Sequence, residues 1–511
     1  MADKSGVVPI SSEHRPIESC VVVGGGTAGW MTAALLGRVL RNTGASITLL
    51  ESPQIDTVGV GEATVPSFVD FIRILGISEP DFVRKTSATF KLGIRFTDWQ
   101  TPGHHYWHPF GNIGARIDGQ PFFQQWLKSH FYGTAGEYTD YSPSAAMARA
   151  GKFYIPDPGK PNNLTRMGYA LHFDAARVAE YLADYAQRQG VKRISAHVES
   201  VHKSDDGSIK SIRTENGGCI EGDFFIDCSG QRALLMQGAL QVGYRDWRDY
   251  LPVNGAAVLQ SENGDDLPPY TEAIAEKCGW RWRIPLQSRT GNGYVFCDEY
   301  CSQDEAAALL LKKITGKPLG DPRLLHFRTG RREKMWHKNC VAVGLSSGFL
   351  EPLESTSIYL IMRAALNLVK LLPGRDHCQA TEDEYNRLMD IEYENIRDFI
   401  VMHYCTSRRD DSLFWQGWRH RPIPESLQTK LSLYKSRGQL VHNDLDLFAS
   451  DSWHAVLTGM GVYPRDYSAV VDASDFDKVD KLLKDIDNSL SHSVGQLLSH
   501  REYLQRLISH C

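Results

Sequence analysis

The first strong pattern along the chain is an apolar run that ends in glycines. Cys20–Val23 is a short, mostly β-branched run, Gly24–Gly29 is rich in glycine, and Trp30–Leu36 has the composition of a helix. A second apolar run, Ile47–Leu50, ends in Glu51. This order predicts a strand, a glycine turn, a helix and a second strand within about 30 residues.

Residues 90–97 alternate between apolar and polar side chains, which is the period of a strand with one buried face. The residues of the apolar face are Phe90, Leu92, Ile94 and Phe96. Those of the opposite face are Lys91, Gly93, Arg95 and Thr97. We expect one continuous strand here, and a lysine on the polar face of such a strand ordinarily points to water.

The remaining pattern interleaves strand and helix signals and becomes mainly helical from about Ile358. The clearest expected elements are a helix from about Ser67 to Leu75, an amphipathic helix over Asp174–Gln189 with Asp174 as its N-cap, a strand meander over 194–227, a short buried strand over 340–345, and helices over 382–404 and 477–507. Such a succession predicts an α/β flavoprotein with a discontinuous nucleotide-binding module.

Four regions follow from these patterns. Residues 1–18 form a polar, proline-punctuated tail, and residues 19–375 form the discontinuous cofactor-binding module. Residues 100–165 carry many aromatic, proline and glycine residues with little periodicity, which predicts a loop-rich insertion; the family resemblance given below implies that it belongs to the substrate cavity. Residues 376–511 form a mostly helical module on the substrate side.

Composition narrows the class of protein. The 511 residues are 42% apolar and 23% charged, with a net charge of −5, which is typical of a soluble globular protein. The acidic balance argues against a nucleic-acid or anionic-membrane surface. The 10 cysteines are scattered without the spacing of a zinc site, so no metal is expected and the thiols are expected to be reduced.

Ser19–Gly37 approaches the length of a membrane span, yet its cluster of glycines breaks the apolar run. No basic segment or small-residue cleavage site frames it as a signal. We therefore expect a cytoplasmic protein without a membrane-spanning segment.

The glycine turn has the GxGxxG spacing of a dinucleotide-binding site. Gly24 suits the tight turn, Gly26 lets the backbone approach a pyrophosphate, and Gly29 lets helix and strand pack closely. Glu51, at the end of the second strand, is placed to accept hydrogen bonds from a ribose. The expected cofactor-binding residues are Gly24, Gly26, Thr27, Ala28, Gly29 and Glu51.

Three segments taken together resemble the flavin-dependent tryptophan halogenase family. They are GGGTAGWM from Gly24, WRWRIP over 280–285 and PLESTSI over 352–358. Further similarity lies in residues 61–64, the Phe90-Lys91 pair, 108–111 and 171–174, and the resemblance runs from about residue 19 to at least residue 415.

The resemblance implies a flavin monooxygenase-like FAD-binding fold and a particular chemistry. A separate flavin reductase supplies FADH2, hypohalous acid forms from O2 and chloride or bromide, and an electron-rich, indole-type ring is halogenated by electrophilic aromatic substitution. The alternatives are a flavin-dependent aromatic monooxygenase and a catalytically silent flavoprotein. The oligomeric state stays open, with a homodimer as one candidate.

Lys91 and Glu354 match the family's catalytic residues. The resemblance implies that Lys91 handles hypohalous acid, either by a hydrogen bond from its ammonium or as an N-halo amine. The ordinary pKa of lysine, ~10.4, favours the ammonium unless burial lowers it. Glu354 is implied to stabilise the cationic ring intermediate or to take its proton.

Further roles are implied for other positions. Thr356 and Ser357 match the backbone positions that hold halide, and many family members carry glycine where this chain has Ser357. Val198 and Leu345 match backbone contacts of FAD. The expected flavin barrier consists of Trp280 and Trp282, and the expected wall of the substrate cavity consists of His108, Phe110, Phe448 and Trp453.

One departure from the family concerns the substrate. Enzymes that act on free tryptophan carry paired tyrosines and a glutamate that bind the amino-acid group, whereas residues 436–443 here contain neither. A pocket without those polar partners loses most of its reason to prefer a zwitterion. We therefore expect free tryptophan to be a poor substrate compared with indole or a substituted indole.

Overall fold

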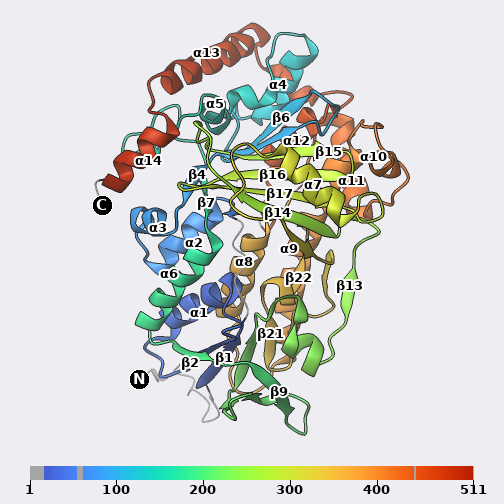
Figure 1. The fold of residues 1–511 in the computed structure, drawn as a ribbon. Coiled ribbons are helices and arrows are strands. Elements are labelled where there is room, and N and C mark those ends of the chain that lie inside the picture. The colour runs from blue at the N-terminus through green and yellow to red at the C-terminus, as the bar shows by residue number, and fades with distance from the viewer. Residues whose placement is uncertain (1–15, 55–60, 442–444, 510–511) are drawn as a thin grey trace, which may run out of the picture.

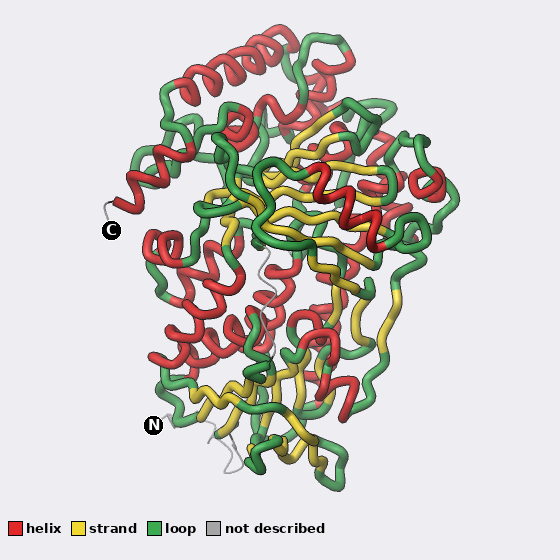
Figure 2. The backbone as a smooth tube through the Cα atoms, in the orientation of Figure 1, coloured by secondary structure: helices red, strands yellow, loops and turns green. Residues whose placement is uncertain are grey.

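The computed structural model describes residues 16–54, 61–441 and 445–509. These residues form two larger sheets with helices between and around them (Figure 1). The sheet that contains β1 and β2 lies near the N-terminal end, and the sheet that contains β14–β17 lies beyond α8. Figure 2 shows the two layers of strands in yellow and the helices that surround them in red.

The first sheet has six strands, and all neighbours run parallel except the β20–β21 pair. Its order is β20 (Trp336–His337), β21 (Cys340–Ala342), β12 (Phe224–Asp227), β1 (Ser19–Val23), β2 (Ser46–Glu51) and β8 (Lys192–Ser195). Val21 and Val23 pack into one apolar cluster, and Cys20 and Val22 pack into another. Because both faces of β1 are covered, its residues form an uninterrupted apolar run.

The predicted strand, turn, helix and strand near the N-terminus are confirmed as β1, α1 (Thr27–Leu40) and β2. The helix expected over 67–75 is α2 (Ser67–Leu75). Asp174 caps α6 (Ala175–Arg188), because its side chain accepts hydrogen bonds from the backbone N–H groups of Ala176 and Arg177.

The second sheet has seven strands and carries the WRWRIP segment as one of its inner strands. Its order is β18 (Arg323–His326), β14 (Gly255–Ser261), β17 (Thr290–Phe296), β16 (Gly279–Pro285), β15 (Thr271–Glu276), β5 (Gly93–Thr97) and β6 (His105–Pro109). A separate three-stranded sheet contains β3 (Glu62–Ala63), β7 (Ala170–Phe173) and β4 (Thr89–Lys91), in that order.

The expectation of one continuous strand over 90–97 is wrong. The chain leaves the β4–β7 pair at Lys91 and enters the seven-stranded sheet at Gly93, with the N–H of Leu92 donating to the carbonyl of Pro269. Both faces of the segment between β4 and β5 are covered by other residues. Lys91 is therefore fully buried and does not point to water. The alternation in sequence could not reveal a second layer over the polar face.

The meander expected over 194–227 is confirmed in its middle part, where β9 (Val198–Lys203), β10 (Ile209–Thr214) and β11 (Cys219–Glu221) pair antiparallel. The strand expected over 340–345 ends at Ala342, and Leu345 lies in the turn η4 (Gly344–Ser346). A last small sheet contains β13 (Tyr244–Asp246), β19 (Gly330–Arg332) and β22 (Gly348–Phe349).

The C-terminal part is helical, as the pattern indicates. Its helices are α8 (Ser357–Lys370), α9 (Gln379–Cys405), α10 (Leu413–Gly417), α11 (Glu425–Arg437), α12 (Ser450–Gly459), α13 (Phe476–Gly495) and α14 (His500–Ser509). Besides α1, α2 and α6, the helices outside that part include α3 (Glu79–Lys85), α4 (Phe122–Phe131), α5 (Pro143–Arg149) and α7 (Gln303–Lys313). Between α4, α5 and β6, the insertion over 100–165 runs in loops and turns.

Most of the expected N-terminal tail, residues 1–15, lies outside the described residues. Pro16 forms a β-bridge with Gly374, and Ile17 is buried. The division of the chain at residue 375 stays a prediction. Among the described residues, no helix has the length and apolar character needed to cross a membrane.

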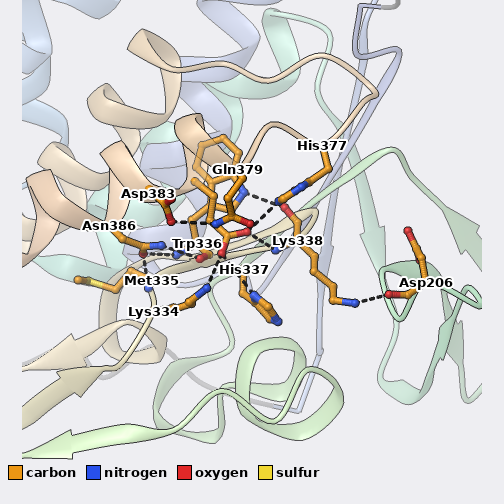
Figure 3. Close-up of polar contacts among 11 residues, drawn as sticks. Asp206, Lys334, Met335, Trp336, His337, Lys338, His377, Gln379, Asp383 and Asn386 are labelled. Atoms are coloured by element: carbon orange, nitrogen blue, oxygen red, sulfur yellow. Dashed lines mark hydrogen bonds and ion pairs between the residues drawn. The ribbon is translucent and has the colours of Figure 1, made fainter.

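Helix α9 holds the β20–β21 hairpin, which leads directly into η4 (Figure 3). The side-chain oxygen of Asn386 accepts from the N–H groups of Met335 and Trp336, at 2.8 and 2.9 Å, and its NH2 donates to the carbonyl of Trp336. One turn earlier, Glu382 pairs with Lys334 and accepts from the N–H of Lys338. Two side chains on one helix face therefore fix the backbone of the hairpin.

Asn386→Ala removes three hydrogen bonds and leaves the backbone groups of the hairpin without partners. We expect the free energy of unfolding to fall by about 2 kcal/mol or more. The matched control is Asp383→Ala, an exposed residue of the same helix, which we expect to change it by less than about 0.5 kcal/mol. Urea unfolding of both variants measures the difference, and equal losses would contradict the role of Asn386.

Candidate active site

The glycine turn forms a cradle that opens on one side. Gly24 has a φ of +121°, and a Cβ there would lie 2.1 Å from the carbonyl oxygen of Cys228. A Cβ on Gly29 would lie 1.8 Å from the carbonyl oxygen of Gly24. A Cβ on Gly26 would meet no atom within 4 Å. Gly24 and Gly29 are therefore required by the fold itself, whereas Gly26 is free to serve a ligand.

The cradle opens into a cavity of about 920 Å³, which is near the upper end of the range for cofactor sites. All residues expected at the cofactor or halide except Gly29 contribute to its lining: Gly24, Gly26, Thr27, Ala28, Glu51, Val198, Leu345, Thr356 and Ser357. Trp280 and Trp282 line the same cavity. Its size and the glycine cradle fit an extended dinucleotide.

Glu51 lies at the end of β2, where a ribose-binding acid is expected. It forms an ion pair with Arg193 of β8, whose guanidinium lies 5.8 Å from the ring centre of Trp30. Arg193 also lines the cavity, and the sequence reasoning did not identify it. Its place follows from the parallel pairing of β2 with β8, which brings residues far apart in sequence side by side.

Lys91 is fully buried at the end of β4. Its Nζ donates to the carbonyl oxygen of Thr64 at 3.0 Å and to Oγ of Ser355 at 2.9 Å. It also lies 5.0 Å from the ring centre of Phe110. Burial lowers the pKa of Lys91 to about 7, although the negative charge of Glu354 opposes this shift. Both the ammonium and the neutral amine are therefore present near neutral pH.

Glu354 is also buried and lies close to two histidines. Its Oε2 lies 2.8 Å from Nδ1 of His108, and its Oε1 lies 2.9 Å from Nε2 of His403. Burial would raise the pKa of Glu354, but His108 and His403 outweigh that effect and lower the pKa to about 2. The side chain is therefore a carboxylate throughout the physiological pH range.

The backbone at this point is unusual. Glu354 and Ser355 have φ values of +65° and +60°, so two consecutive non-glycine residues adopt the left-handed conformation. Helix α8 begins immediately after them, with Thr356 as its N-cap residue and Ser357 as its first residue. The Thr356 side chain does not cap the helix, and the first turn contains no acidic residue. The free N–H groups there suit an anion.

On the other side of this loop lies an aromatic wall. His108 packs 5.9 Å from Phe448, Phe448 stacks on Phe399 at 3.8 Å, and Trp453 meets Phe399 edge-on at 5.0 Å. Phe110 packs 6.5 Å from His108. The structure thus brings together the four residues expected at the substrate cavity, and it adds Phe399, which the sequence reasoning missed.

The two tryptophans of the expected barrier share one face of β16, at 5.9 Å from each other. The indole N–H of Trp280 and the hydroxyl of Tyr404 both donate to Oε2 of Glu351, at 3.3 and 2.8 Å. Burial raises the pKa of Glu351 to about 8, so its carboxyl group is protonated at neutral pH. Trp280 is therefore fixed at its polar edge as well as by packing.

A dinucleotide-sized cavity on an α/β fold, next to a buried lysine and a buried carboxylate, defines an enzyme that works with a nucleotide cofactor. Comparison with known proteins shows which kind of enzyme within this class the chain is. A family model described as tryptophan halogenase matches residues 19–475. The chain belongs to the tryptophan halogenase family and is a flavin-dependent halogenase.

Tryptophan 6-halogenase SttH of Streptomyces toxytricini is 37% identical over 447 residues, which are 82% of this chain and 84% of that protein. BrvH, a flavin-dependent halogenase from Brevundimonas sp. BAL3, has a TM-score of 0.92 and 43% identity, covering 96% of this chain and 99% of its own. Xcc4156, a flavin-dependent halogenase from Xanthomonas campestris, has a TM-score of 0.93 and 40% identity, covering 96% and 99%. These relatives support the halogenase and give no support to the aromatic monooxygenase.

Lys91→Met removes the buried amine and with it a pH dependence of stability. Because burial lowers the pKa from 10.5 to about 7, the unfolded chain binds one more proton than the folded chain between these values. Wild-type stability therefore gains a contribution that rises with pH there, by at most about 1.4 kcal/mol per pH unit. The variant lacks it.

Urea unfolding at pH 7, 8 and 9 compares the two proteins. We expect the free energy of unfolding of the variant, relative to wild type, to decrease steadily as the pH rises. The control is Lys192→Met, whose side chain is exposed on β8. Parallel curves for wild type and Lys91→Met would contradict the lowered pKa.

Proposed function

We propose that this protein is an FADH2-dependent halogenase that acts on indole or a substituted indole rather than on free tryptophan. A separate flavin reductase supplies FADH2 by diffusion, and the enzyme works in the cytoplasm. The observation that carries the proposal is the loop Glu354–Ser357, which lines the cofactor cavity on one side and meets His108 of the aromatic wall on the other. When bound, reduced FAD would supply two electrons to O2, and the halide would give up two more, so that hypohalous acid and water form.

Different residues of this chain bind FAD, bind the halide and keep the substrate apart from the flavin. The glycine cradle and the start of α1 hold the pyrophosphate of FAD. Glu51 and Arg193 line the part of the cavity that holds the ribose. The N–H groups of Thr356 and Ser357 bind chloride or bromide at the start of α8. Trp280 and Trp282 keep the aromatic substrate away from the flavin side, so that halide reacts there first.

Lys91 receives the hypohalous acid between the two sides. Its ammonium has three N–H donors, and Thr64 and Ser355 use two of them. The third is free to donate to the oxygen of hypohalous acid, which makes that oxygen a better leaving group as the ring attacks the halogen. We therefore propose that Lys91 acts through its ammonium form, by a hydrogen bond to hypohalous acid, rather than as an N-halo amine.

Glu354 acts on the ring. When the aromatic carbon bonds to the halogen, the ring carries a positive charge, and a carboxylate with a pKa of about 2 is negatively charged beside it. Glu354 stabilises that cation and accepts the proton from the halogenated carbon. The product leaves as a neutral aryl halide, and the proton combines with the hydroxide released from hypohalous acid to form water.

Lys91→Ala tests the two-sided arrangement. We expect halogenated product to fall at least 100-fold, because nothing orients hypohalous acid. FAD affinity and the rate of flavin reoxidation are expected to stay within about twofold of wild type, since Lys91 does not line the cofactor cavity. Product is measured by mass spectrometry and reoxidation by flavin absorbance. Retained product formation would refute the assignment.

Gly26→Ala tests the cradle. The added methyl group meets no protein atom within 4 Å, so we expect the thermal unfolding temperature to be unchanged. It stands where the backbone approaches the pyrophosphate, so we expect FAD to bind at least 10-fold more weakly. Gly29→Ala is the contrasting variant, which we expect to lose both stability and binding. Unchanged FAD affinity in Gly26→Ala would argue against this binding mode.

The substrate preference is tested by competition. Equal concentrations of indole and L-tryptophan are offered with a flavin reductase, NADH, FAD and bromide, and the brominated masses are compared. We expect indole products to exceed tryptophan products at least 10-fold, because residues 436–443 contain no paired tyrosines or glutamate. Of these residues, 442 and 443 lie outside the described part of the structure. Efficient, regioselective bromination of L-tryptophan would overturn this preference.

A further inference from the structure

His403 is a buried residue next to Glu354 that the sequence reasoning did not single out. It lies in the last turn of α9 and has no exposed surface. Its ring stacks on Phe96 at 4.6 Å and meets Phe399 edge-on at 5.4 Å. Both of its nitrogens face polar groups: Nε2 lies 2.9 Å from Oε1 of Glu354, and Nδ1 lies 2.8 Å from the hydroxyl of Tyr106.

For a neutral imidazole ring, only one arrangement of protons satisfies all of these contacts. An ionised carboxylate can only accept, so His403 must carry its proton on Nε2, facing Glu354. Its Nδ1 is then an acceptor, and the hydroxyl of Tyr106 donates to it. Burial lowers the pKa of His403, which keeps the ring neutral with a single N–H. Tyr106 therefore selects the tautomer that offers an N–H to Glu354.

The contact between His403 and Glu354 is close in distance but poor in angle. Nε2 of His403 and Oε1 of Glu354 have no well-aligned hydrogen-bond partner among the described residues. Hydrogen bonds at catalytic groups are often poorly aligned before substrate binds. A small rotation of the carboxylate would align this one, whereas Oε2 is already bonded to His108.

The backbone gives Glu354 a particular need for such a partner. Two consecutive left-handed residues, Glu354 and Ser355, are costly and persist only where their surroundings hold them. Ser355 is held by Lys91, and His108 holds one oxygen of Glu354. Among the described contacts of Glu354, His403 is the polar side chain placed to fix the second oxygen, and it comes from α9, whereas His108 comes from β6.

We propose that His403, with its tautomer set by Tyr106, is a positioning residue that keeps Glu354 ionised and aimed at the ring during halogenation. This role rests on the proposed function, because it concerns the carboxylate that stabilises the cationic ring and takes its proton. His403 itself does not touch the substrate. Without the His403 N–H, the buried carboxylate loses one of the two donors that stabilise its charge, so it takes up a proton at a higher pH.

The test is the pH dependence of kcat for halogenation between pH 5 and 9 in wild type, His403→Leu, His403→Gln and Tyr106→Phe. Wild type is expected to show no loss of kcat on the acidic side. His403→Leu is expected to lose at least 10-fold in kcat and to gain an acidic limb above pH 5. His403→Gln retains an N–H donor and is expected to recover most of kcat without that limb. Tyr106→Phe is expected to fall between them.

His454→Gln is the matched control, because His454 is also buried and stacks on Phe123, and the structure shows no contact between it and Glu354. It is expected to leave the pH profile unchanged. FAD affinity and thermal unfolding are measured for each variant, and Tyr106→Phe, which removes one hydroxyl, keeps the test informative if His403→Leu folds poorly. A wild-type profile in His403→Leu and Tyr106→Phe would overturn the inference. Absence of halogenated product from wild type would instead overturn the proposed function.

Discussion

The attachment of the Glu354–Ser357 loop to both sides of the active site is the constraint on which the rest of the structure depends. Ser355 accepts a hydrogen bond from Lys91, and Glu354 bonds to His108 of the aromatic wall. The next two residues start α8 at the cofactor cavity. A loop with two left-handed residues thus joins the cofactor-sized cavity, the start of α8 where we propose that halide binds, and the aromatic wall within four positions.

This arrangement requires charges in places where water cannot solvate them. Lys91 and Glu354 are both buried, and an isolated charge there would be neutralised by a shift in its pKa. The two groups are affected differently. Burial dominates at Lys91 and brings its pKa to about 7, whereas the nearby histidines dominate at Glu354 and hold its pKa at about 2. One group can thus change its protonation state near neutral pH while the other remains charged.

The sequence predicts the cofactor side better than the substrate side, for a physical reason. The strand, glycine turn and helix around Gly24–Gly29 form a local unit, so spacing alone identifies it. At Leu92 the chain passes from one sheet to another, and Lys91 is buried by strands and helices that are distant in sequence. The alternation of apolar and polar residues indicates one buried face of a strand but not what covers the other face. Arg193, Phe399 and His403 reach the site through tertiary packing, and no local motif marks them. The resemblance supplied Lys91 and Glu354, while the contacts that tune them became visible only in the fold.

The most direct test of the central claim asks which atom the enzyme adds to an aromatic ring. The wild-type protein is incubated with a flavin reductase, NADH, FAD, indole and bromide, and the product is examined by mass spectrometry. The account predicts a monobrominated indole that carries the bromine isotope pattern and disappears when halide is omitted. An oxygenated product that forms equally well without halide would contradict it.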